Sequence, residues 1–428
     1  MPERIIKASK ELRRRATDLR DDIRESADSN LLGILRFLGL LYGPIDRHAR
    51  IDQALRTSLK YRLAPHVGWR HALGGITYLL LMILVATGVL MAFYYRPSAQ
   101  EAYSSIQHIV TRVPFGWLIR DLHSWAASAV IVVVLAHMAR TFFQSTYKPP
   151  REMNWFIGVL LLVVLLAFGA TGYLLPWDQW AYWTVTELLT VVPRIPLVGG
   201  LLAELVTGDV IVSGATLSRH FAIHVIILPW ILFALVGLHF ALVRKHGVTP
   251  PAGPVDRDGP GIPFFPHHLL RSVVVAVFVV GVLVSLAVLF PRPFSAAANP
   301  QAPPADMVSS WVIVDVSRAV LRYLGVWGFA LFALIGFVLA ALPFWDREPA
   351  AGMRSRPLVA AIGLVFFLGI VGAWAAGRTL QSEPPAASVA PAAVPAAAAD
   401  GLPLESPGLS PPRLDAPPEG SVPDPGGG

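Results

Sequence analysis

The stretch that decides the fold is FGWLIRDLHSWAASAVIVVVLAHMAR, residues 115–140. It is an apolar run long enough for a membrane helix, and it carries His123 and His137 fourteen residues apart. On a helix, fourteen residues advance about 21 Å and return to within about 40° of the starting face. This helix therefore offers one histidine near each membrane surface, on roughly one face.

A second apolar run repeats the pattern. RHFAIHVIILPWILFALVGLHFALVRKHG, residues 219–247, carries His224 and His239 fifteen residues apart, a spacing that overshoots one face by about 60°. A lone histidine in an apolar helix is more often a packing or hydrogen-bonding residue than a ligand. Ionisable residues inside a membrane are expensive, however, and are functional by default. Four at matched spacing predict two bis-histidine sites stacked across the bilayer, suited to two haems.

The composition is that of a polytopic membrane protein. Only 15% of the 428 residues are charged, and the mean hydropathy is +0.56. The absence of cysteine excludes a cysteine-ligated iron–sulfur cluster, a covalent CxxCH haem and a disulfide within this chain. Any iron–sulfur or c-type centre must therefore lie in a partner. The net charge of +7 does not indicate nucleic acid, because much of it lies in the N-terminal segment and in loops on one side.

Hydropathy predicts seven membrane helices, each long enough to cross about 30 Å of hydrocarbon. The expected spans lie near 73–95, 117–140, 155–175, 221–243, 270–290, 321–345 and 357–377. The predicted fold class is an all-α integral membrane protein with a four-helix dihaem core and about three further transmembrane helices.

Four parts are expected along the chain. Residues 1–67 should form a basic cytoplasmic arm with surface helices, 68–247 the four-helix dihaem domain, 248–380 a three-helix membrane domain, and 381–428 a disordered Pro/Ala-rich tail.

The distribution of basic residues predicts the orientation. The N-terminal arm and three basic loops fall on one side if the chain crosses seven times, and that side is predicted to be cytoplasmic. His123 and His224 then lie towards the outer face, and His137 and His239 towards the cytoplasmic face. The pairing of 123 with 224 and of 137 with 239 follows from this alternation.

Glycines repeat the fourteen-residue spacing in two neighbouring spans. Gly74 and Gly88 lie in the first span, and Gly158 and Gly172 in the third. Because glycine has no side chain, a porphyrin edge can approach its backbone closely. Helix packing through small residues is the alternative, and the matched spacing favours haem contact.

Two arginines lie near the histidines of residues 115–140. Arg120 precedes His123 by three residues, and Arg140 follows His137 by three. Each guanidinium can pair with a haem propionate or simply extend to the membrane interface. Both readings stay open on spacing alone.

Several motifs between residues 52 and 247 carry a family resemblance: LGGIT, ATGVLMAFYYRP, FGWLIRDLH, KPPREMNW, TGYLLPWDQWAYW, ATLSRHFAIH and LHFALVRKHG. The chain resembles cytochrome b of the quinol:cytochrome c reductases, most closely the split, shorter form of the photosynthetic plastoquinol enzymes. Residues 260–380 resemble, more weakly, the separate small subunit of that form.

The resemblance implies two non-covalent b-type haems and a quinone substrate. His123 and His224 would hold the outer, low-potential haem, and His137 and His239 the inner, high-potential one. The two arginines and four glycines would be haem contacts. Membrane lipid, a Rieske iron–sulfur protein, c-type cytochrome subunits and a second copy of the chain are the implied partners, in a bacterial inner (plasma) membrane.

Two positions depart from the family pattern. Ala72 stands where the split form has a cysteine for an extra haem, which excludes a covalent third haem. The outer quinol site of the family has a Pro-Glu-Trp-Tyr motif, and residues 309–312 here read Ser-Ser-Trp-Val. Trp311 survives, but the proton-accepting glutamate does not. Asp315 and Asp178 are the candidate replacements, or else ordinary capping or interfacial aspartates.

Three functions compete. In the first, the chain is the dihaem subunit of a quinol-oxidising complex and carries electrons across the bilayer between quinone sites; the intact PWDQW stretch favours it. In the second, it links a cytochrome or dehydrogenase to the quinone pool without bifurcation at an outer site; the altered quinol motif favours that. A haem-free transporter or scaffold is the third class, and the matched histidines disfavour it.

Overall fold

The computed structural model describes residues 62–209, 211–248, 261–293, 295–304, 311–346 and 356–379. Nearly all of the predicted arm, the whole predicted tail, and Ser309 and Ser310 lie outside these residues. Within the described part, seven helices are long and apolar enough to cross a membrane. The all-α membrane fold and the number of spans are thus confirmed.

Three spans of the N-terminal half are single α-helices: α3 (Ala72–Ala92), α5 (Gly116–Phe143) and α6 (Glu152–Tyr173). The fourth is composite. It consists of α9 (Gly214–Ala222), a π-helical turn (Ile223–Ile227) and α10 (Leu228–His246).

Both ends of the composite helix are encoded locally. Ser213 is its N-cap and accepts a hydrogen bond from the Ala215 N–H at 3.2 Å, which satisfies one of the free amides of the first turn. At the other end three basic residues occupy the last turn of α10, where the helix dipole favours positive charge. Gly247 stops the helix with a φ of +66°, a value that suits glycine.

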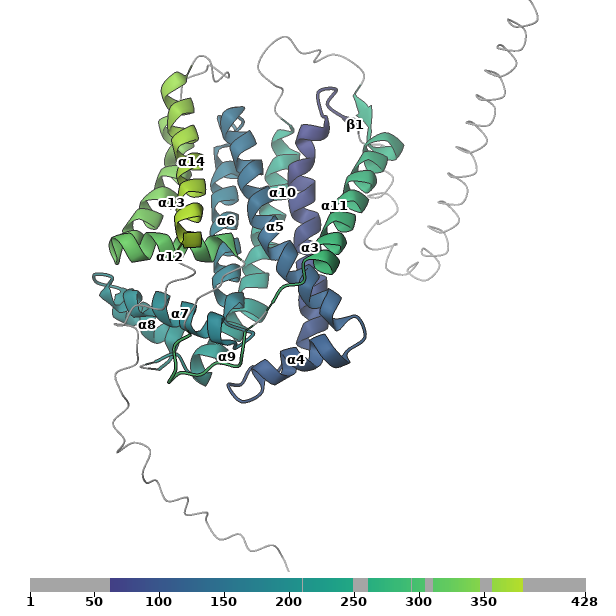
Figure 1. Cartoon of the computed structure of the whole chain (residues 1–428). Coiled ribbons are helices and arrows are strands. Elements are labelled where there is room, and N and C mark those ends of the chain that lie inside the picture. Colours follow the sequence, from purple (N-terminus) through teal and green to yellow (C-terminus); the bar gives the residue numbers. More distant parts are fainter. Residues whose placement is uncertain are drawn as a thin grey trace, which may run out of the picture. The chain divides into compact units, whose positions relative to one another are not determined.

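Short helices gather at the end of the spans nearer His123 and His224. They are α4 (Ala102–Arg112), α7 (Gln179–Val191) and α8 (Gly199–Thr207), and Figure 1 shows them with α9 below the spans. Helix α4 buries Ile106 and Ile109 and exposes Gln107 and Arg112. Such a division of faces is typical of a helix at a membrane surface.

The C-terminal half contains α11 (Leu269–Leu289), α12 (Val312–Leu324), α13 (Trp327–Trp345) and α14 (Pro357–Thr379). The predicted span over 321–345 begins too early, because the chain breaks at Gly325, which has a φ of +55°. Helix α12 is therefore a separate element, and in Figure 1 it lies across the lower ends of α13 and α14.

The spans pack as two helix pairs with the later helices around them. Helix α3 lies against α5 and α6 against α10, while α11 packs on α5 and α13 on α6. A two-residue antiparallel pairing of β1 (Arg62–Leu63) with β2 (Ile262–Pro263) joins the start of the described chain to the start of the C-terminal half. Buried apolar residues of α5 and α6, such as Val130, Val134 and Leu162, form the core between the pairs.

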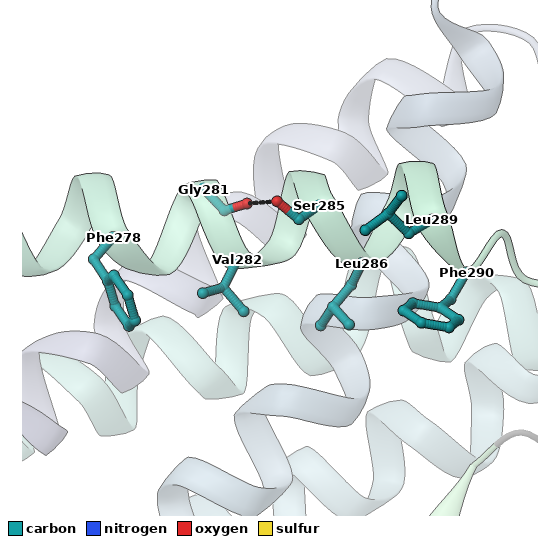
Figure 2. A pocket seen from close by; sticks show the side chains of 7 residues that line it. All are labelled: Phe278, Gly281, Val282, Ser285, Leu286, Leu289 and Phe290. Carbon is teal, nitrogen blue, oxygen red and sulfur yellow. Dashed lines mark hydrogen bonds between the residues drawn. The ribbon is translucent and has the colours of Figure 1, made fainter.

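The exposed side of α11 is a shallow apolar surface (Figure 2). Phe278, Val282 and Leu289 lie along it, and the Ser285 hydroxyl donates to the Gly281 carbonyl at 2.8 Å. Because this hydroxyl is satisfied within its own helix, the surface suits contact with acyl chains.

A buried polar cluster attaches the C-terminal helices to the α5–α6 connection. Asp346, directly after α13, accepts hydrogen bonds from Tyr147, Arg356 and, at 3.0 Å, Lys148. Arg356 also donates to Ser145 and, at 3.0 Å, to Tyr147. Burial opposes the charge of Asp346, but the hydrogen bonds from Tyr147 and Lys148 and the charge of Arg356 hold its pKa below the usual range. Asp346 therefore stays ionised and paired at neutral pH.

Candidate functional site

The four histidines form two facing pairs. His123 of α5 is close enough to His224 in the π turn for the two rings to interact electrostatically. His137 of α5 interacts in the same way with His239 in α10. Below, these are called the 123/224 pair and the 137/239 pair. Along α5 the two pairs are separated by about 21 Å, and they are the pairs that the alternation of spans predicted.

The π turn explains how a fifteen-residue spacing can serve the same purpose as a fourteen-residue one. In this turn the Leu228 N–H donates to the Ile223 carbonyl five residues back, so one extra residue is taken up before α10 continues. Pro229, in the first turn of α10, has no N–H to complete an ordinary helical bond to Val225. The bulge thus removes most of the overshoot and brings His224 and His239 to one face.

Each predicted glycine lies against one histidine ring. A β-carbon added at Gly88 would lie 3.3 Å from Cε1 of His123, and one at Gly74 would lie 3.5 Å from Cε1 of His137. On the other helix pair, a β-carbon added at Gly172 would lie 2.5 Å from Cε1 of His224. One added at Gly158 would lie 3.8 Å from Cε1 of His239. The glycines therefore give room to the imidazoles themselves; direct contact with a porphyrin remains a prediction.

The unequal clearances predict unequal tolerance to alanine. Gly172→Ala is expected to lower the occupancy of the haem at the 123/224 pair at least severalfold, because a methyl group there would displace the His224 ring. Gly158→Ala is the matched control, since its methyl would meet His239 at ordinary van der Waals distance. Haem content per purified chain, measured optically, checks both variants, and equal occupancy in the two would contradict the role assigned to Gly172.

Two threonines hold the rings of the 123/224 pair. Thr87 Oγ1 lies 2.9 Å from Nδ1 of His123, and Thr171 Oγ1 lies 3.1 Å from Nδ1 of His224. Sequence reasoning missed both threonines, although each directly precedes one of the spaced glycines, in the repeated triplet Ala-Thr-Gly.

The residues present fit a haem at each pair. Each pair offers two imidazoles, and among the described residues no cluster of three or more His, Cys, Asp or Glu side chains could hold a metal ion. Two imidazoles suit an iron that takes its other ligands from a porphyrin, whereas a zinc site or a non-haem iron site uses three or more protein ligands.

Arg120, three residues before His123, belongs to a polar cluster. Arg120 pairs with Asp121 at 3.0 Å and donates to the backbone carbonyl of Arg292. The Arg292 guanidinium lies 3.6 Å above the Trp125 ring, and burial lowers the pKa of Arg292 to about 10. Asp121 and Arg292 were not predicted. Contact of Arg120 with a haem propionate stays a prediction, as does that of Arg140, which lies in the last turn of α5.

The candidate carboxylates near the PWDQW stretch differ in their surroundings. Asp178 is the N-cap of α7: its Oδ1 accepts from Ala181 N at 2.8 Å and its Oδ2 from Ser295 N at 3.1 Å. The capping role that the sequence left open is thus confirmed. Burial raises the pKa of Asp178 despite these hydrogen bonds. Asp315, in the first turn of α12, is only 1% exposed.

Trp311 connects α12 to α6. It is the N-cap residue of α12 and stacks on Tyr173 at 6.4 Å between ring centroids, above the backbone of Gly169. Asp315 follows it by one helical turn, as predicted. A further carboxylate, Glu187 of α7, pairs with Arg318 of α12 at 3.2 Å. No sequence signal identified this ion pair, because its members are 131 residues apart.

These features define the class: a membrane protein whose helix pairs present two bis-imidazole sites. The sequence model of the cytochrome b/b6/petB family matches residues 58–247. The chain is 44% identical over 194 residues to cytochrome b6 of Prochlorothrix hollandica, covering 45% of this chain and 87% of that protein. It is 44% identical over 187 residues to cytochrome b6 of Mastigocladus laminosus, covering 44% and 87%. The chain therefore belongs to the cytochrome b family, whose members are membrane electron-transport proteins that bind b-type haem.

The structural likeness reaches further along the chain than the sequence likeness. A chain of the solved "Hyperthermophilic respiratory Complex III" matches with a TM-score of 0.70 and 29% identity, covering 79% of this chain and 91% of that one. Such coverage extends past residue 247 into the C-terminal helices.

Proposed function

We propose that this chain is the dihaem subunit of a quinol-oxidising, Complex III-like assembly and carries electrons across the bilayer between quinone sites. The observation that carries the proposal is the pair of facing histidine couples, one towards each end of α5. The likeness to cytochrome b6 and to a Complex III chain supports it.

The axial ligands would be His123 with His224, and His137 with His239. When bound, each haem supplies a one-electron redox centre. The protein orients the rings through α5 and α10, gives them room through the four glycines, and excludes water with the apolar core of α5 and α6. Arg120 and Arg140 would balance propionate charge at the two ends of α5.

Quinol oxidation would take place near the 123/224 pair, where α6, α7 and α12 meet. Trp311 would form part of the wall of this site. A quinol that loses its electrons must also lose protons, so the site needs a base. Asp315 is the proposed base. Asp178 remains the second candidate, with its carboxylate oxygens already engaged by backbone amides.

The proposed partners follow from what the chain lacks and from its relatives. With no cysteine, the chain needs a Rieske protein and c-type cytochrome subunits to supply the remaining centres. We further propose a homodimer in a bacterial inner membrane with the N-terminus in the cytoplasm, where the basic arm and loops would satisfy the positive-inside rule.

The haem count tests the proposal directly. Purified protein is expected to contain two b-type haems per chain and no covalent haem, because there are two histidine pairs and no cysteine. The pyridine haemochrome assay, run before and after acid–acetone extraction, measures both quantities. Haem that stays on the polypeptide after extraction, or one haem per chain, would contradict the proposal.

A second function keeps both haems but omits quinol bifurcation at the outer site. The chain would then link a cytochrome or dehydrogenase to the quinone pool. The loss of the motif glutamate from residues 309–312 favours it. Identification of the subunits that co-purify with the intact complex separates the two, since a Rieske protein is required only by the first.

A further inference from the structure

The hydroxyl groups of Thr87 and Thr171, beside the 123/224 pair, already donate their hydrogens to backbone carbonyls of their own helices. Thr87 Oγ1 donates to the Ile83 carbonyl at 2.6 Å, and Thr171 Oγ1 donates to the Ala167 carbonyl at 2.8 Å. A hydroxyl carries one hydrogen and two lone pairs. Each threonine oxygen therefore accepts from the histidine ring, so Nδ1 of His123 and of His224 carries the ring hydrogen and donates it.

This donation leaves Nε2 of both rings with a free lone pair. A neutral imidazole has one protonated and one unprotonated nitrogen, and the partner of the first decides which nitrogen binds a metal. The two hydrogen bonds therefore select the tautomer with an unprotonated Nε2 in both histidines of the pair. The two threonines that accept them lie on different helices, α3 and α6.

The 137/239 pair has no such support. Nδ1 of His137 and Nδ1 of His239 are buried without a hydrogen-bond partner among the described residues. The backbone of Asn154 lies near the His239 ring, as the backbones of Leu84 and Phe168 lie near the rings of His123 and His224. The difference between the pairs is therefore the threonine hydroxyl, which only His123 and His224 have at Nδ1. The two pairs, alike in offering two imidazoles, thus differ at Nδ1.

We propose that Thr87 and Thr171 are positioning residues that lower the reduction potential at the 123/224 pair relative to the 137/239 pair. A ring that donates from Nδ1 is the more basic ligand through Nε2, and a more electron-rich axial ligand favours ferric over ferrous iron. The threonines thereby help to separate the potentials of the two sites. The proposal rests on the proposed dihaem function.

Threonine-to-valine variants of the complete complex test it. Thr87→Val and Thr171→Val keep the side-chain shape and remove the acceptor. Each is expected to shift the one-electron equilibrium of the haem at the 123/224 pair about fivefold towards the reduced form, which is about 40 mV at about 59 mV per tenfold. The double variant should shift further. The haem at the 137/239 pair should keep its potential. Optical redox titration of the purified complex measures both haems at once.

Thr77→Val is the matched control, because the Thr77 hydroxyl lies on the same helix as Thr87 and donates to the Leu73 carbonyl at 2.9 Å, while Nδ1 of His137 and of His239 accept or donate no hydrogen bond among the described residues. Thr87→Ser and Thr171→Ser keep the acceptor and should retain the unmutated potential. If one valine variant loses the haem, the other still tests the proposal, because its haem should titrate at a higher potential while both serine variants keep the unmutated one.

Two sets of results would overturn the proposal. Unchanged potentials in the valine variants, or an equal shift in Thr77→Val, would contradict the role of these hydroxyls. Loss of the haem in both serine and valine variants would contradict it as well. A failure of the proposed dihaem function would look different, since the unmutated protein would then lack two titrating b-type haems.

Discussion

Replacing His224 with alanine is expected to remove one b-type haem completely, and replacing His123 is expected to remove the same one. In the proposed sites each side chain would supply one of the two histidine ligands of a haem, and a single remaining imidazole would not hold it. His137→Ala and His239→Ala should each remove the other haem. Reduced-minus-oxidised spectra of the four variants resolve the two components.

His220→Ala is the matched control for these variants. His220 lies one turn before His224, is only 4% exposed, and donates a hydrogen bond from Nδ1 to the Thr216 carbonyl at 2.8 Å. His220 lies close enough to His224 on the same helix to interact with it electrostatically, but its Nδ1 is bonded to the backbone of its own helix, so both haems should remain when it is replaced. If His123→Ala and His137→Ala abolished the same optical component, the pairing across α5 and α10 would be wrong.

The second large effect is expected at Asp315. Asp315→Asn should slow quinol oxidation at least about tenfold, because an amide cannot accept the quinol proton. Both haem spectra should stay intact, since α12 does not carry a histidine ligand. Steady-state quinol:cytochrome c activity, normalised to haem content, is the measurement.

Two parallel variants sharpen this test. Asp178→Asn removes the second candidate base, and Glu187→Gln removes a carboxylate that pairs with Arg318, one turn beyond Asp315 on α12. The burial-raised pKa of Asp178 makes it a carboxylate that titrates closer to neutral pH. Near-normal turnover in an Asp315→Asn, Asp178→Asn double variant would exclude both aspartates. A complete loss of quinol oxidation in Glu187→Gln, with normal activity in both aspartate variants, would identify Glu187 of α7 as the proton acceptor instead.

The membrane helices could be predicted because a bilayer imposes a minimum apolar length that few other structures satisfy. The positions of the 123/224 and 137/239 pairs could be predicted for a related reason. Because a helix rises by a fixed length per residue, the number of residues between two histidines gives their separation along the membrane normal. The break at Gly325 was missed because Leu324 and Val326 beside it are apolar, and the long apolar run after it outweighs Arg322 in a hydropathy average. The π turn was missed because hydropathy does not register one extra residue, although Pro229 marks its end.

The surroundings of the histidines were harder to predict. Thr87 and Thr171 are ordinary in a membrane helix, where a hydroxyl usually bonds to its own backbone, and only the fold brings each beside a ring. The same applies to Glu187 and Arg318, which meet because α7 and α12 cross. The haem roles of the glycines and arginines remain predictions, supported by where these residues lie.

The contacts between the two halves of the chain have a consequence for assembly. Residues 295–299 dock on the start of α7, and β1 pairs with β2, whereas the cytochrome b6 relatives align with less than half of this chain. Because both halves belong to one polypeptide, their docking avoids the loss of translational and rotational freedom that separate subunits pay, about 4–15 kcal/mol. The effective concentration of each half near the other is about millimolar. Their ratio is therefore fixed at one to one, and dilution cannot separate them.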